Sequence, residues 1–134
     1  MSYDKVKYYR LSEEGKAEAL RKLEEILQKN DKIKSAYVFG SFIRRNAFRD
    51  IDIAVYSVPS LTLEGLLELG AKIELELGFP ADVAQLQDLN PKLRLKILME
   101  GKPVIMRSNE LHGRLISHSA SEIQDYEISK TRAR

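Results

Sequence analysis

The sequence contains no cysteine, so disulfide bonds, thiolate metal sites and cysteine nucleophiles are all excluded. It has only two histidines, His112 and His118, which makes a histidine-based zinc site hard to assemble. No apolar run approaches the roughly 18 residues that a membrane span needs. The charged N-terminal segment also has no signal-peptide core. These absences predict a soluble cytoplasmic protein that does not enter a membrane.

Neither sign of charge dominates the composition. There are 22 basic and 20 acidic residues, with a net charge of +2, and this balance does not indicate a nucleic-acid binder. A chain of 134 residues can enclose one hydrophobic core. We therefore expect residues 1–134 to form a single domain, with a basic, frayed end from about residue 128. The two histidines are expected at the surface of the last helix, without a role.

Helical and strand patterns follow one another along the chain. Helices are predicted from Ser12 to about Gln28, from Pro59-Ser60 to Gly78, from Asn90-Pro91 to Gly101, and weakly over 109–134. Strands are predicted over 33–39, 50–57, 81–87 and 103–106. The passage from 39 to 50 is too short for a helical crossover, so the sheet must be mixed or antiparallel there. The fold class is α/β (α+β): a small mixed sheet of about four strands flanked by helices.

Two acidic residues, Asp50 and Asp52, stand inside an apolar strand pattern. Side chains at i and i+2 of a strand point to the same face, so the two carboxylates lie together. Carboxylate oxygens are the ligands that Mg²⁺ prefers, and a two-metal site needs several of them. We therefore expect a third acid on a neighbouring strand. Asp82, which begins the third strand in another apolar setting, is the candidate, whereas Asp88 lies in a loop.

A Gly40-Ser41 turn precedes the acidic pair. Glycine lets the backbone approach a ligand closely, and exposed amides in such a turn can hold phosphate oxygens. Ser41 adds a hydroxyl donor, and a short helix over 42–46 would add a favourable dipole. Arg44 and Arg45 lie within reach of further phosphate charge. Amides and arginines for phosphates, beside carboxylates for metal ions, predict a nucleoside-triphosphate site.

The spacing of these motifs resembles the signature of the polymerase beta-like nucleotidyltransferase superfamily. Gly40-Ser41 is followed, after eight residues, by Asp50-Ile51-Asp52, a gap shorter than the spacing commoner in that superfamily. Within it, the chain resembles the minimal nucleotidyltransferases (MNT proteins) over nearly its whole length. The resemblance implies metal ligation and catalysis by Asp50, Asp52 and Asp82, with two Mg²⁺ or Mn²⁺ ions. It implies nucleotide contacts from Gly40 and Ser41, and Arg44 matches a position where the family often has arginine.

The resemblance also implies an activity and a partner. The family transfers a nucleoside monophosphate from an NTP, usually ATP, and members paired with HEPT toxins resemble antitoxins that adenylylate a tyrosine of the toxin. Larger relatives carry a second domain that holds the acceptor. No such domain is expected here, so a HEPT-like partner or a second subunit of a homo-oligomer must hold it, at an open cleft.

Two functional classes remain open. One is a metal-dependent nucleotidyltransferase that adenylylates a partner protein. The other is a non-catalytic module that neutralises a toxin by occlusion and keeps only a vestigial nucleotide pocket. Retention of all three acids favours the first class.

Overall fold

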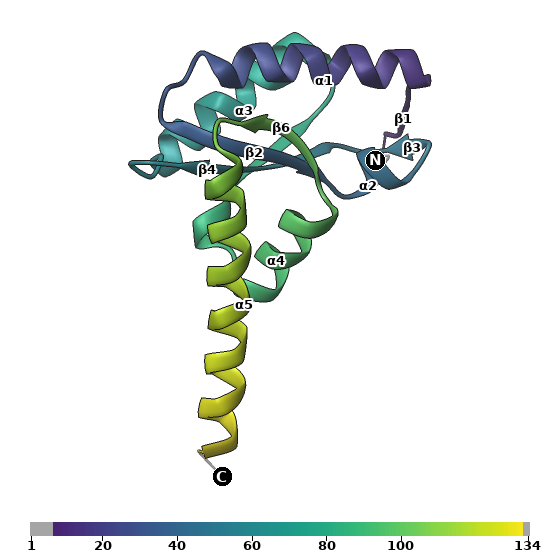
Figure 1. The fold of residues 1–134 in the computed structure, drawn as a ribbon. Helices are drawn as coiled ribbons and strands as arrows, with labels where there is room; N and C mark the ends of the chain where they lie inside the picture. Colours follow the sequence, from purple (N-terminus) through teal and green to yellow (C-terminus); the bar gives the residue numbers. More distant parts are fainter. Residues whose placement is uncertain (1–6, 133–134) are drawn as a thin grey trace, which may run out of the picture.

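The computed structural model describes residues 7–132, built around a mixed four-stranded sheet with strand order β5-β4-β2-β6 (Figure 1). β2 pairs antiparallel with both β4 and β6, whereas β4 and β5 run parallel. The antiparallel step between β2 and β4 confirms the expectation drawn from the short connection between them. The strands are β2 (Ile33–Phe39), β4 (Ile51–Ser57), β5 (Ala81–Gln85) and β6 (Lys102–Met106).

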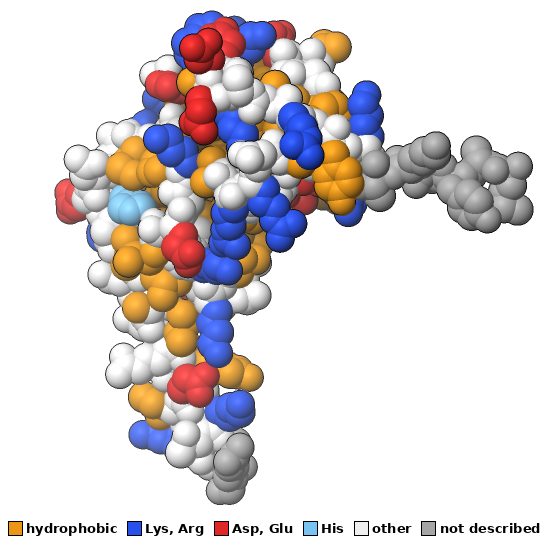
Figure 2. All heavy atoms as spheres, turned by 90° about the vertical axis from the view of Figure 1, so that its right-hand side faces the viewer, with side chains coloured by type: hydrophobic (Ala, Val, Ile, Leu, Met, Phe, Trp, Pro, Cys, Tyr) orange, Lys and Arg blue, Asp and Glu red, His pale blue; other side chains and the backbone are white. Residues whose placement is uncertain are grey.

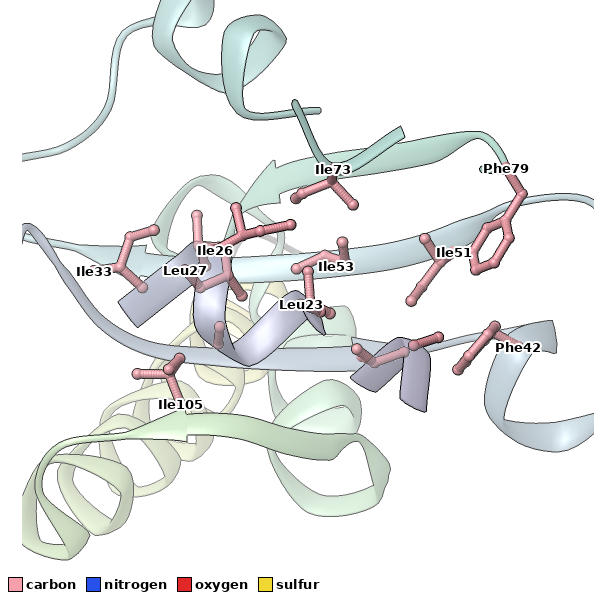
Figure 3. Close-up of a cluster of buried hydrophobic side chains, with 14 of the residues drawn as sticks. Leu23, Ile26, Leu27, Ile33, Phe42, Ile51, Ile53, Ile73, Phe79 and Ile105 are labelled. Atoms are coloured by element: carbon pink, nitrogen blue, oxygen red, sulfur yellow. The ribbon is translucent and has the colours of Figure 1, made fainter. Parts of the chain in front are cut away.

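Helices cover both faces of this sheet. The main hydrophobic core lies on the face covered by α1 and α3, where Leu23, Ile53 and Ile73 are fully buried (Figure 3). A second cluster, containing Tyr37, Ala54 and Ile97, lies on the other face under α4 and α5. The predicted alternation of the second strand is therefore confirmed, because its isoleucines enter the first core and Ala54 the second. The helices are α1 (Glu13–Gln28), α3 (Leu63–Leu77), α4 (Pro91–Glu100) and α5 (Asn109–Arg132).

The helix ends have the caps that the sequence indicates. The Ser12 side chain accepts a hydrogen bond from the Gly15 amide at 3.0 Å, and that of Asn90 accepts one from Leu93 at 3.0 Å. Gly78 ends α3 with φ 85°, a left-handed conformation that favours glycine. The start of α3 lies a few residues later than the Pro59-Ser60 turn because Thr62 provides its N-cap.

A small second sheet was not predicted. β1 (Tyr9–Arg10) pairs antiparallel with β3 (Ala47–Phe48). In the chain, β3 lies between the one-turn helix α2 (Ser41–Arg44) and β4. Aromatic packing stabilises this small sheet. The centroid of the Phe48 ring lies 4.8 Å from that of Phe42 and 5.0 Å from that of Phe79. A two-residue strand is too short to produce an alternating pattern in the sequence.

The C-terminal segment differs from expectation in two respects. α5 continues to Arg132, through the segment predicted to fray, and extends well beyond the sheet (Figure 1). Thr131 donates a hydrogen bond to the Glu127 carbonyl at 3.0 Å, and basic residues in the last turn favour a helix C-terminus. His112 is half-buried, with Nδ1 2.7 Å from the Tyr37 hydroxyl, whereas His118 is exposed as predicted. Among the helices described within residues 7–132, none combines the length and the hydrophobicity that a membrane span requires.

Lys16 ties α1 to the end of α2. Its ammonium group donates hydrogen bonds to the carbonyls of Phe42 and Arg45, both at 2.7 Å. These carbonyls are at the end of α2, where the helix dipole also favours a cation. Lys16 therefore fixes the short helix that follows the Gly40-Ser41 turn.

We predict that Lys16→Met lowers the free energy of unfolding by about 1–2 kcal/mol, because two carbonyls lose a charged donor. Lys22→Met is the matched control, since Lys22 is exposed on the same helix. Urea denaturation followed by circular dichroism measures both variants. Equal stabilities of the two variants would show that Lys16 does not hold α2.

Candidate active site

The sheet topology brings the predicted site residues to one end of the sheet, where β2 ends and where β4 and β5 begin. In the antiparallel pairing of β2 with β4, Phe39 lies opposite Asp52. In the parallel pairing of β4 with β5, Asp52 lies beside Asp82. Asp52 therefore stands between the end of β2, where Gly40 follows, and the start of β5. Asp50 lies just before β4 begins, not inside the strand as predicted.

Gly40 makes the close approach that forms the site. It has φ 81° and ψ −154°, a conformation that residues with side chains rarely adopt. A Cβ at this position would lie 2.5 Å from Oδ2 of Asp52. The sequence analysis assigned Gly40 to backbone contact with phosphate. The structure adds a second reason for glycine, which is space for the Asp52 carboxylate.

The charge of the three aspartates accumulates around Asp52. Burial raises the pKa of Asp52 to about 6, with further contributions from the nearby charges of Asp50 and Asp82. In the part of the chain that the structure describes, none of the ion pairs involves any of these three acids. The site thus concentrates negative charge without a basic side chain bound to it.

The donor set has the chemistry for a hard cation. Carboxylate oxygens suit Mg²⁺ and Mn²⁺, and the mutual repulsion at Asp52 is the kind that a bound cation relieves. Among residues 7–132, no three acidic or histidine side chains are already gathered closely enough to hold one ion. The strand register nevertheless makes Asp52 and Asp82 neighbours on adjacent strands, with Asp50 two residues before Asp52 in the chain.

A cavity of about 420 Å³ lies next to the Gly40 turn, between α2 and α4. Two basic side chains, Arg44 from α2 and Lys96 from α4, line it together with Glu100, whose carboxylate lies 4.0 Å from Arg44. Figure 2 shows Lys and Arg side chains gathered on the face at this end of the molecule. The cavity walls are otherwise mainly apolar, with Phe39, Ile43, Leu93 and Ile97.

The structure brings most of the predicted site residues together, but not all of them. Ser41 begins α2 beside Gly40, and Arg44 ends it within the cavity lining. Arg45 is exposed, does not line the cavity, and contributes only its carbonyl to Lys16. Lys96 was missed, because helical spacing places it near Leu93 and Glu100 but does not reveal which element that face meets.

The motifs of the site lie within a match to a known protein family. The family model of polymerase beta nucleotidyltransferases matches residues 21–110, a segment that includes the Gly-Ser turn and all three aspartates. Comparison with curated protein sequences gives no significant match.

Solved structures share the fold. A chain in the crystal structure of the toxin-antitoxin MntA-HepT is 21% identical with a TM-score of 0.72, covering 87% of this chain and 94% of that chain. A chain of the toxin-antitoxin with AMP-PNP is 23% identical with a TM-score of 0.74, covering 85% and 94%. A chain in the structure of the complex between the tri-AMPylated Shewanella oneidensis HEPN toxin and MNT antitoxin is 21% identical with a TM-score of 0.73, covering 88% of this chain and 94% of that chain.

The expected mixed sheet flanked by helices is thus the polymerase beta-like nucleotidyltransferase fold, as the motif spacing indicated. The family model covers more than half of the sequence and contains every residue of the predicted site. The chain therefore belongs to the polymerase beta nucleotidyltransferase family.

Proposed function

We propose that this chain transfers AMP from ATP to a hydroxyl group of a partner protein. The observation that carries the proposal is the position of Asp52, which lies between Asp82 and the Gly40 turn at one end of the sheet. Nucleotide transfer needs carboxylates beside a turn whose amides can hold phosphate, and the place of the Gly40 turn next to Asp52 supports this role. The raised pKa of Asp52 supports the same interpretation, because perturbed acids are common at catalytic sites.

The cavity beside Gly40 is proposed to bind the triphosphate. Amides at the start of α2 and the Ser41 hydroxyl would donate to phosphate oxygens, and Arg44 and Lys96 would neutralise their charge. Glu100 would then lose its contact with Arg44, because phosphate competes for the same guanidinium group. Arg45, predicted from sequence as a further nucleotide contact, is proposed to act only through its carbonyl contact with Lys16.

Asp50, Asp52 and Asp82 are proposed to hold Mg²⁺ or Mn²⁺, which when bound stabilises charge on the α-phosphate and activates the acceptor hydroxyl. In the transfer, the acceptor oxygen forms a bond to the α-phosphorus, and the bond from that phosphorus to the bridging oxygen breaks. Pyrophosphate leaves, and the hydroxyl proton passes to solvent. The protein mainly positions the two reactants and excludes competing geometries.

The partner is proposed to be a HEPT-like toxin, with this chain as its cytoplasmic antitoxin. The support is that the similar solved chains come from toxin-antitoxin complexes, one with AMP-PNP and one with a tri-AMPylated HEPN toxin. We propose one domain over residues 1–134, with the acceptor held by the toxin or by a second copy of the chain. A tyrosine hydroxyl is the proposed acceptor group.

Occlusion of a toxin without catalysis is the alternative, and an activity measurement separates the two. We predict that the wild-type chain transfers labelled AMP from α-³²P-ATP, in Mg²⁺, to a HEPT-like toxin that forms a complex with it. Asp82→Asn should reduce the rate at least a hundredfold, because it removes one ligand charge while conserving shape. Asp88→Asn, an exposed acid in the following turn, is the control and should keep the wild-type rate.

Mass spectrometry of the partner identifies the modified residue. A wild-type chain that binds the partner and leaves it unmodified would support occlusion. Transfer by Asp82→Asn at the wild-type rate would remove Asp82 from the site.

The burial of Asp52, together with the charges of Asp50 and Asp82, also predicts a pH dependence of stability. Its pKa is raised from 3.8 in the unfolded chain to about 6, so the folded protein binds more protons between these values. Stability therefore falls as the pH rises through this window. Asp52→Asn should remove this loss and stabilise the protein at pH 7 by about 1 kcal/mol, after allowance for solvent screening.

Thermal unfolding at pH 4.5 and pH 7 without divalent metal measures the effect, with Asp88→Asn as control. The increase in melting temperature caused by Asp52→Asn should be a few degrees at pH 7 and much smaller at pH 4.5. Equal melting temperatures of Asp52→Asn and Asp88→Asn at both pH values would contradict the raised pKa of Asp52.

A further inference from the structure

A groove of about 310 Å³ lies between α3 and β5, lined mainly by small and apolar residues together with the carboxylates Glu74 and Asp82. Two leucines on its α3 side are unusually exposed, Leu63 at 74% and Leu67 at 66%. Neighbouring exposed leucines over a groove indicate an interaction site, because a monomer gains nothing by leaving them in water. The groove lining also includes Leu66, Ala71, Val83 and Asp82.

β5 borders this groove as an edge strand. In the described part of the chain, its one strand neighbour is β4. An edge strand can pair with an extended segment of another protein through its backbone groups. The amide of Ala81 already donates to the Glu74 carboxylate at 2.9 Å, so an added strand would pair beyond that point, alongside residues 82–85.

Asp82 belongs to both the groove and the proposed metal site. The groove thus borders the β5 backbone beside Asp82, whereas the cavity with Arg44 and Lys96 lies on the β2 side. No Lys or Arg lines the groove in the described structure, so a triphosphate would find no counter-charge there. Its chemistry suits apolar side chains and an extended backbone.

We propose that the groove between α3 and β5 binds an extended segment of the acceptor protein and brings its hydroxyl to Asp82. This inference rests on the proposed function and adds how the acceptor is recognised. Ala81 and Val83 pack toward the α3 face, whereas Asp82 points to the opposite face of the strand. A segment paired with β5 alternates in the same way. The acceptor residue therefore carries apolar neighbours at i−1 and i+1, which contact Leu63 and Leu67.

A displayed library of nonapeptides with a fixed central tyrosine tests this, with selection on the full chain in the absence of ATP. Leu67→Lys places a charge in the groove. Leu75→Lys is the matched control, because Leu75 is 84% exposed on the same helix and does not line the groove. Leu63→Lys is a second groove variant, and circular dichroism checks the folding of all three.

We expect wild type and Leu75→Lys to select peptides with apolar residues on both sides of the tyrosine. A labelled peptide of this class should bind both equally by fluorescence anisotropy, and at least tenfold more weakly to Leu67→Lys and Leu63→Lys. Selection without apolar neighbours, or equal binding to groove and control variants, overturns the inference.

The same peptides separate this inference from the proposed function when Mg²⁺ and α-³²P-ATP are added. A peptide that binds through the groove but stays unlabelled supports the groove and contradicts the transferase proposal. A peptide labelled equally fast by Leu67→Lys and Leu75→Lys supports the transferase and overturns the groove.

Discussion

The approach of the Gly40 backbone to the Asp52 carboxylate is the contact on which the rest of the site depends. A Cβ at residue 40 would meet Oδ2 of Asp52 at 2.5 Å, so glycine leaves this carboxylate its present place, and the φ of 81° independently favours glycine in the turn. The contact joins the element proposed to bind phosphate to the one proposed to bind metal. It also keeps Asp52 half-buried, where its pKa rises to about 6 because of burial and two neighbouring acids.

The surrounding fold supports this contact from two directions. β2 and β4 are antiparallel and β5 is parallel to β4. The end of β2 and the starts of β4 and β5 therefore lie at the same end of the sheet. On the outside, Lys16 binds the carbonyls at the end of α2. Aromatic packing of Phe42, Phe48 and Phe79 lies beneath it. Both α1, through Lys16, and the small β1–β3 sheet therefore help to fix the turn at Gly40.

The sequence was sufficient for elements with a long, regular pattern. The alternation after Asp50 and the periodic leucines of the helices predict the main sheet and its layers, because burial on one face enforces these periods. The glycine-serine turn and the acids were predictable since each has a chemical reason to interrupt an apolar pattern. The β1–β3 pairing was not, because two-residue strands depend on tertiary packing.

The same limit applies within the site. Lys96 has no local signature, and its position in the cavity with Arg44 follows from how α4 packs against β2. Arg44 and Arg45 are adjacent in the sequence, yet only Arg44, at the end of α2, lines the cavity. The half-burial of His112 likewise depends on the Tyr37 hydroxyl from a strand far away in the chain.

The central claim is that the Gly40 turn and the three aspartates form one nucleotide site that works with a divalent cation. Calorimetric titration of ATP into the protein, in Mg²⁺ and again in EDTA, tests this most directly. The account predicts at least tenfold tighter binding in Mg²⁺, because the carboxylates repel the triphosphate until a cation lies between them. Equal affinity in the two buffers would contradict it.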